Sequence, residues 1–169
     1  MVSSSTEPTN GLRRYALLGI KDARSCRLSW SCALMKITGL GGALLREKIV
    51  AAASDRLVIV VDQEKLVERL GEHTPIPVEV TQFGWQATAT ALAKLGCVLE
   101  RRYAAREQPY VTDGGNFILD CRFGPLADPG AMEQRLAMTV GTVESGLFIG
   151  RTSVVVVASM SGVEVLAPR

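Results

Sequence analysis

The sequence predicts an α/β protein, a partial Rossmann-like parallel-sheet domain that carries an inserted ferredoxin-like lobe. Residues 57–61 form an unbroken apolar run, which is typical of a strand buried on both faces of a parallel sheet. Residues 75–150 then follow the order strand, helix, strand, strand, helix, strand, which is the ferredoxin-like unit. A chain of 169 residues, 47% of them hydrophobic, is long enough for such a core with a small appended unit.

Residues 1–36 differ from the rest of the chain in charge and pattern. They carry six basic and two acidic residues, whereas acidic residues outnumber basic ones in the remainder. Residues 1–10 are polar and predict a disordered tail. Residues 11–36 show neither a helical nor a strand period, so no element is predicted there. We therefore expect an atypical, poorly ordered segment over residues 1–36.

The predicted parallel-sheet domain comprises residues 37–74 and 151–169. Glycines precede an Ala- and Leu-rich helix over 43–54, which leads into the strand at 57–61. A short helix is expected at about 64–70, ending at Gly71. Two strand-like runs, 154–158 and 163–166, flank a turn at Ser161-Gly162, and we expect both to return to this sheet.

The predicted lobe spans residues 75–150. Residues 78–83 alternate like a half-buried strand, and the helix at 85–95 ends at Gly96, a residue common at helix C-termini. Strands are expected at 97–102, 116–122 and 143–148. Pro129 and an apolar stripe predict a helix between the last two strands. A solvated sheet face or loop is expected for the charged residues Glu100, Arg101, Arg102, Arg106 and Asp120.

Composition argues against several kinds of partner. A net charge of +2 is too small to indicate a nucleic acid or a membrane surface. No stretch approaches the roughly 20 apolar residues of a membrane span, and the start lacks the apolar core of a secretory signal. The four cysteines lack metal-type spacing and His73 is the only histidine, so no metal is expected. Reduced thiols in a cytoplasmic protein are the simpler interpretation.

Glu47 is the first candidate for chemistry. Glycines before a helix allow close backbone approach, and the free N–H groups there favour an anion. Glu47 lies about one turn into this helix on a mostly apolar face, a setting that suits proton transfer near neutral pH. A solvated Glu47 paired with a nearby arginine or lysine explains the same pattern, and spacing alone favours that explanation.

Two further segments carry polar side chains in suggestive places. Lys65 follows the end of the buried strand, where ligands bind in open parallel sheets, and its charge could hold a phosphate. A short helix capped by Asp62, with Lys65 in solvent, explains this segment equally well. Residues 112–116 could form a polar site, but Asp-Gly-Gly-Asn is strong turn chemistry and predicts a plain connection between two strands.

Six segments occur in an order that resembles one family. They are GALLREKIV, DQEKLV, PIPVEVTQFGW, VTDGGNFILDC, LADPGAMEQRL and GTVESGLF. From about Gly39 to the C-terminus the chain resembles the A-type ribose-5-phosphate isomerases. The resemblance implies interconversion of D-ribose 5-phosphate and D-ribulose 5-phosphate in the pentose phosphate pathway, through an enediol(ate) and without a metal or other cofactor. It also implies a cytoplasmic protein that forms dimers or larger oligomers.

The resemblance assigns roles to particular residues. Glu47 would be the general base that moves a proton between C2 and C1, and Lys65 would contact the sugar phosphate. The substrate would be lined by Thr38, Gly39, Leu40, Gly41 and Gly42.

Upstream of Gly39 the chain departs from the family pattern. The family has a lysine directly before the glycine loop, where this chain has Thr38, and Lys36 lies two residues earlier. The family's acidic segment and phosphate loop have no counterpart further upstream. A frame-shifted or mis-started reading of residues 1–36 explains this, and so does a divergent short form. The function hypothesis is the isomerase. The alternative is a catalytically impaired truncated homologue that acts as a sugar-phosphate-binding or interaction module.

Overall fold

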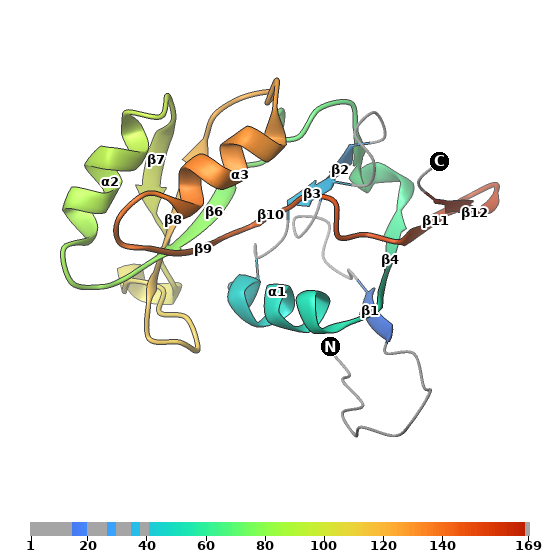
Figure 1. Ribbon diagram of the computed structural model, residues 1–169, viewed down its shortest axis with the longest axis horizontal. Helices are drawn as coiled ribbons and strands as arrows, with labels where there is room; N and C mark the ends of the chain where they lie inside the picture. The colour runs from blue at the N-terminus through green and yellow to red at the C-terminus, as the bar shows by residue number, and fades with distance from the viewer. Residues whose placement is uncertain (1–14, 20–26, 30–34, 38–40, 168–169) are drawn as a thin grey trace.

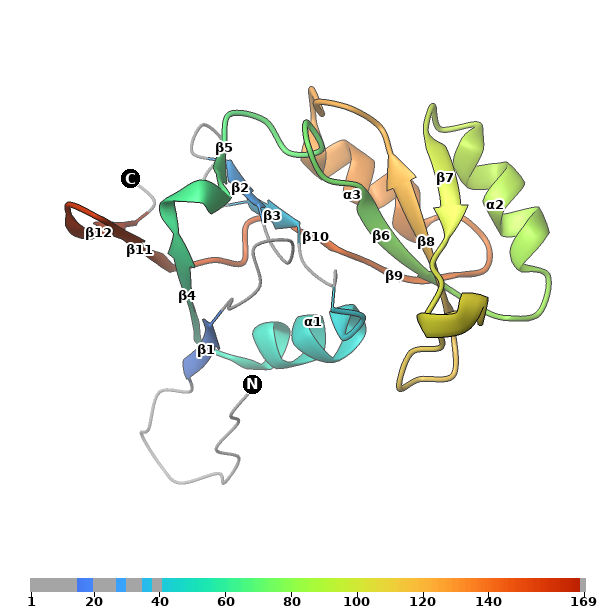
Figure 2. The same ribbon diagram turned by 180° about the vertical axis from the view of Figure 1, so that it is seen from behind.

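The computed structural model describes residues 15–19, 27–29, 35–37 and 41–167, the first three ranges by their backbone only. Figures 1 and 2 show a lobe at one end of the molecule and a mainly parallel sheet at the other. A small third sheet lies between them, and helix α1 (Leu44–Ala53) runs from the lobe to the parallel sheet.

The mainly parallel sheet has the strand order β1-β4-β11-β12. β4 pairs in parallel with both β1 and β11, and β12 pairs with β11 in antiparallel fashion. The expected return of the C-terminal strands to this sheet is confirmed. Its core includes Leu57, Ile59, Val155 and Val157. The strands are β1 (Tyr15–Gly19), β4 (Arg56–Asp62), β11 (Val154–Ser159) and β12 (Gly162–Leu166).

The lobe contains an antiparallel sheet with the strand order β7-β8-β6-β9. Its helices α2 (Trp85–Ala93) and α3 (Pro129–Ala137) each follow one strand and lead to the next. Side chains of both helices share one apolar core with the sheet. This order and topology agree with the predicted ferredoxin-like unit. The strands are β6 (Ile76–Val80), β7 (Val98–Arg101), β8 (Phe117–Arg122) and β9 (Thr142–Ser145).

A third sheet of short strands joins the two halves, in the order β10-β3-β2-β5. It brings together backbone from the N-terminal segment, from the region after β4 and from the end of the lobe. The strands are β2 (Arg27–Ser29), β3 (Met35–Ile37), β5 (Leu66–Val67) and β10 (Leu147–Phe148).

The sequence pattern assigned no element to residues 11–36, whereas the structure has strands there. β1 and β2 lie within this range, and β3 begins in it. Their partners β4, β5 and β10 are distant in the sequence. Pairing through backbone hydrogen bonds requires no apolar period within the strand itself, so the local pattern did not indicate them. The predicted disordered tail over residues 1–10 lies outside the described residues.

Two local predictions around the third sheet were wrong. Residues 64–70 do not form a helix: a single 3₁₀ turn, η1 (Gln63–Lys65), leads directly into β5, which pairs with β2. The strand expected over 143–148 is divided into β9 and β10. The N–H of Gly146 donates to the carbonyl of Pro77, and the chain then leaves the lobe sheet to pair with β3. In both places a distant strand supplies the hydrogen-bond partners.

The strand expected at 78–83 starts and ends earlier, and all five residues of β6 are buried rather than half of them. It lies between β8 and β9 in the lobe sheet, so neither edge faces solvent. Phe83, expected in this strand, lies beyond it with 97% of its surface exposed.

Of the charged residues expected on a solvated sheet face or loop, Glu100 is exposed as expected, whereas Arg101, Arg102 and Asp120 are partly buried. Arg102 and Asp120 form an ion pair in which each side chain is only 14% exposed. The guanidinium of Arg101 lies 4.7 Å from the centre of the Trp85 ring, where the cation and the aromatic face attract each other.

Candidate active site

Helix α1 follows a glycine turn at Gly41-Gly42. Gly42 is buried and has a φ of +88°, a left-handed conformation that glycine adopts without steric cost. The helix starts without a side-chain cap at Ala43. Its first-turn N–H groups have no partner within the helix and can therefore face an anion.

The lobe closes over this glycine turn through Tyr110. The Tyr110 hydroxyl donates to the carbonyl of Gly41 at 3.3 Å. A Cβ at Gly42 would overlap the same hydroxyl, whereas a Cβ at Gly41 would meet nothing within 4 Å. The turn therefore needs glycine at position 42 for two reasons, its φ and the approach of Tyr110. No sequence pattern singled out Tyr110.

Glu47 lies on α1 one turn after the glycines, as expected. Its backbone N–H donates to the carbonyl of Ala43 at 2.9 Å, and its side chain is partly buried. The buried face of the helix is formed by Leu44, Lys48 and Ala51, so Glu47 emerges at the margin of this face. Glu47 is therefore neither fully exposed to solvent nor part of the core.

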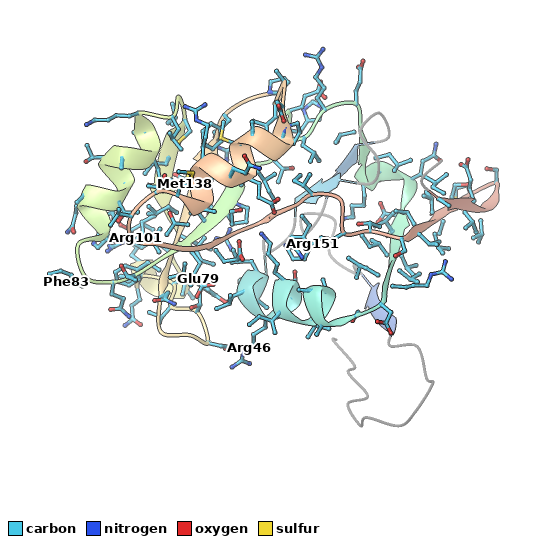
Figure 3. All side chains as sticks on the ribbon, in the orientation of Figure 1. Arg46, Glu79, Phe83, Arg101, Met138 and Arg151 are labelled. Atoms are coloured by element: carbon cyan, nitrogen blue, oxygen red, sulfur yellow. The ribbon has the colours of Figure 1, made fainter. Side chains whose placement is uncertain are left out.

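A pocket of about 80 Å³ lies between the start of α1 and the lobe. Figure 3 shows Arg46 on the helix and Glu79 on the lobe. Arg46 forms an ion pair with Asp113 across the pocket mouth, with 2.8 Å between Nη1 and Oδ2. The pocket is lined by Gly42, Ala43, Leu45, Arg46, Glu79, Thr112, Asp113 and Gly114.

Glu79 contributes a buried carboxylate to the pocket wall. It is 1% exposed, and its Oε1 accepts hydrogen bonds from Thr112 Oγ1 at 2.8 Å and Asn116 Nδ2 at 2.9 Å. The turn predicted over 112–116 is present, with the N–H of Gly115 donating to the carbonyl of Thr112. Thr112 and Asn116 of this turn also donate their side-chain hydrogen bonds to the carboxylate of Glu79. In the sequence, the only indication of a functional role for Glu79 is that it is a single acid between two valines in a predicted strand.

Lys65 follows the end of β4, as expected, but it is buried rather than in solvent. Its side chain is only 1% exposed, and Nζ lies 3.8 Å from Oδ2 of Asp62, whose side chain is about half exposed. Asp62 forms no side-chain cap on η1, so the predicted capped helix with a solvated lysine is wrong.

Of the predicted site residues, Gly41, Gly42 and Glu47 meet at the start of α1. Lys65 lies in η1, directly after the end of β4. Thr38, Gly39 and Leu40 lie outside the described residues.

Lys48, which sequence reasoning did not single out, is buried beside Glu47. Its Nζ donates to Glu144 Oε1 at 2.7 Å and to Glu133 Oε1 at 3.2 Å. Both acids belong to the lobe, so this lysine links α1 to the lobe from inside the structure.

Cys97 and Cys121 are buried free thiols in the lobe. A hydrogen bond with Cys97, together with burial, raises the pKa of the Cys121 thiol above its ordinary value. Within the described part of the chain, no cluster of three or more His, Cys, Asp or Glu side chains could hold a metal ion. Over the same residues, no helix has the length and apolar character needed to cross a membrane.

Comparison with known proteins gives consistent results. The family described as ribose 5-phosphate isomerase A (phosphoriboisomerase A) matches residues 31–162. Ribose-5-phosphate isomerase A of Gloeobacter violaceus is 60% identical over 135 residues, which cover 80% of this chain and 58% of that protein. The chain therefore spans less than two-thirds of this relative's length.

Solved structures show the same likeness. Ribose 5-phosphate isomerase from Plasmodium falciparum superposes with a TM-score of 0.84 at 30% identity, over 97% of this chain and 70% of that one. A D-ribose-5-phosphate isomerase in complex with phospho-erythronic acid gives a TM-score of 0.83 at 32% identity, over 90% of this chain and 64% of that one.

Proposed function

The chain belongs to the ribose 5-phosphate isomerase A family, and on this premise we propose that it interconverts D-ribose 5-phosphate and D-ribulose 5-phosphate. The observation that carries the proposal is the position of Glu47. It lies one turn after the Gly41-Gly42 turn, on a helix whose start borders a pocket, within the segment that matches the family. A carboxylate and a set of free N–H groups are thereby placed at the same helix.

In the proposed reaction, Glu47 acts as the general base. Its carboxylate removes the proton from C2 of the open-chain aldose, and the electrons of the broken C–H bond form the C1–C2 double bond of an enediolate. Glu47 then returns the proton to C1, while the hydroxyl proton moves from O2 to O1 and C2 becomes the carbonyl. Hydrogen-bond donors near the developing oxyanion lower the barrier.

The glycine turn would line the substrate together with the residues before it. A backbone without side chains at Gly41 and Gly42 allows the sugar to approach the N–H groups of α1. Thr38, Gly39 and Leu40 complete the proposed lining. Lys65 is proposed to hold the phosphate, which would have to approach it past the half-exposed carboxylate of Asp62.

The proposal extends to the setting of the enzyme. It would act in the cytoplasm as a homodimer, with a sugar phosphate as its small-molecule partner and with no metal or other cofactor. The reduced thiols Cys97 and Cys121 are compatible with a cytoplasmic location. Exposed apolar side chains on β12 offer a surface for a second copy.

The test follows turnover of ribose 5-phosphate by NMR in the parent chain and in Glu47→Gln. We expect ribulose 5-phosphate from the parent and a kcat about 10²–10⁴-fold lower in the variant, the range that general-base catalysis supplies. Glu100→Gln, the same change at an exposed acid on β7, is the matched control and should retain parental activity.

The alternative function has one observation in its favour. The chain spans 58% of a relative at 60% identity, so parts of a complete site can be missing. A folded parent that binds phospho-erythronic acid without converting ribose 5-phosphate would contradict the isomerase proposal. The same result would support a sugar-phosphate-binding module instead.

A further inference from the structure

We infer that Lys48 is a positioning residue: it fixes the rotation of α1 against the lobe and thereby places the carboxylate of Glu47. The inference rests on the proposed function, because it gives Lys48 a role in the reaction assigned to Glu47. It concerns contacts between two parts of the fold rather than contacts with the substrate.

Lys48 is held from three elements of the chain. Only 6% of it is exposed, and its Nζ donates to Glu144 on β9 at 2.7 Å and to Glu133 on α3 at 3.2 Å. The ammonium also lies 5.1 Å from the centre of the Phe148 ring on β10, within range of a cation–π attraction. The side chains of Glu133 and Glu144 are 23% and 24% exposed, respectively. The lysine is therefore the most deeply buried member of this cluster.

The remaining contacts of α1 specify its rotation less well. Leu44 and Ala51 share the buried face with Lys48, but apolar packing is not directional. The helix has no side-chain cap, and the Arg46–Asp113 pair is largely exposed, so that pair contributes little. β9, which carries Glu144, is the element against which α1 packs most extensively in the described structure. Two charged hydrogen bonds from one ammonium therefore supply the directional contacts.

Even a small rotation of α1 about its axis would displace the side-chain ends on its surface. Side-chain ends lie about 5–6 Å from a helix axis, so a rotation of about 10° moves them by about 1 Å. A misplacement of about 1 Å at a reacting group can cost on the order of 10²-fold in rate. Glu47 directly precedes Lys48, so any rotation that Lys48 prevents would be transmitted to Glu47 in full.

Stability alone gives no reason for a lysine at this position. Burying an ammonium and two carboxylates carries a desolvation cost that often cancels their attraction, and an apolar side chain of similar volume is frequently as stable. The hydrogen bonds of Lys48 with Glu133 and Glu144 instead favour one orientation of α1 against the lobe. Lys48→Met should therefore leave the fold intact while it loosens the orientation of α1.

The experiment measures kcat and KM for ribose 5-phosphate in Lys48→Met, Glu144→Gln and the double variant. Lys94→Met, the same change at an exposed lysine of the lobe, is the control. We expect Lys48→Met to lower kcat at least tenfold with KM within about threefold, because only the placement of the base changes. The double variant should resemble Lys48→Met, because the two side chains act as one unit.

The outcomes separate this inference from the proposed function. If the parent turns over ribose 5-phosphate and Lys48→Met keeps its kcat, or changes KM alone, the inference is overturned and the isomerase proposal stands. If the folded parent shows no turnover, the isomerase proposal fails. Hydrogen exchange over Leu44–Ala53 then decides the structural part: faster exchange in Lys48→Met than in Lys94→Met supports anchoring of α1, and equal exchange overturns it.

Discussion

The side chains that shape this site are charged or polar, yet several of them are buried. Lys48, Lys65 and Glu79 each have less than a tenth of their surface exposed. Glu79 and Lys48 satisfy the usual condition for burying such groups, because each has two hydrogen-bond partners from other parts of the chain. At the residue scale, therefore, the site depends on partners that are distant in the sequence.

Gly42 provides the sharpest residue-scale test. Gly42→Ala places a Cβ onto the Tyr110 hydroxyl at a φ of +88°, so the turn must distort or Tyr110 must leave. We expect a loss of about 1–3 kcal/mol in the free energy of unfolding, the usual cost of such strain, together with reduced activity. Chemical denaturation of the purified variant measures the loss.

Gly41→Ala is the matched control for that change. A Cβ at Gly41 meets no atom within 4 Å, so the stability of this variant should stay close to that of the parent. Equal losses in both variants would show that Tyr110 does not restrict the turn.

Helices α1 and α3 differ in how far their own residues, rather than contacts with distant segments, stabilise their first turn. α3 begins with an Asp128 cap, whose Oδ1 accepts from the N–H of Ala131 at 2.9 Å, followed by Pro129 at the first helical position. α1 begins at Ala43 without such a cap. The orientation of α1 consequently depends on tertiary contacts, whereas the start of α3 is specified by its own residues.

Asp128→Ala tests this difference for α3. Loss of the capping oxygen leaves a first-turn N–H without its partner, and we expect the free energy of unfolding to fall by about 1 kcal/mol. Asp128→Asn should retain most of the stability, because asparagine caps helices as well as aspartate. Thermal unfolding followed by circular dichroism gives both values, and equal stability of all three chains would argue against the cap.

At the scale of the whole molecule, two apolar cores are joined by α1 and the small third sheet. One core lies in the parallel sheet and the other in the lobe. The edge strand β12 leaves Val163 and Val165 largely exposed. An exposed apolar edge strand is a common place for a second chain to pair, which agrees with the proposed homodimer.

The dimer prediction can be checked by sedimentation. We expect the parent to be dimeric and Val163→Lys/Val165→Lys to be monomeric, because charges on an edge strand oppose pairing. Phe83→Lys, an equally drastic change at an exposed apolar residue of the lobe, should leave the dimer intact. A monomeric parent, or a dimer dissociated only by Phe83→Lys, would contradict this placement of the interface.

Much of the fold could be predicted from local pattern. The apolar run at 57–61 and the alternation of elements after residue 75 identified β4, α2, β8 and α3 close to their observed bounds. Predictions failed where the deciding partner is remote. The short strands β2, β5 and β10 exist because they pair with each other or with β3, and their residues alone carry too weak a signal.

The sequence by itself determined the α/β class, the ferredoxin-like order of the lobe, the family and the position of Glu47 after a glycine turn. These depend on periodicity and on the order of motifs, which are written along the chain. Only the tertiary structure decided that Lys65 is buried, that Tyr110 and Glu79 border the start of α1, and that Lys48 joins two lobe carboxylates. Such contacts depend on which distant segments meet, because hydrogen bonds and ion pairs act over a few ångströms in space and leave no period in the sequence.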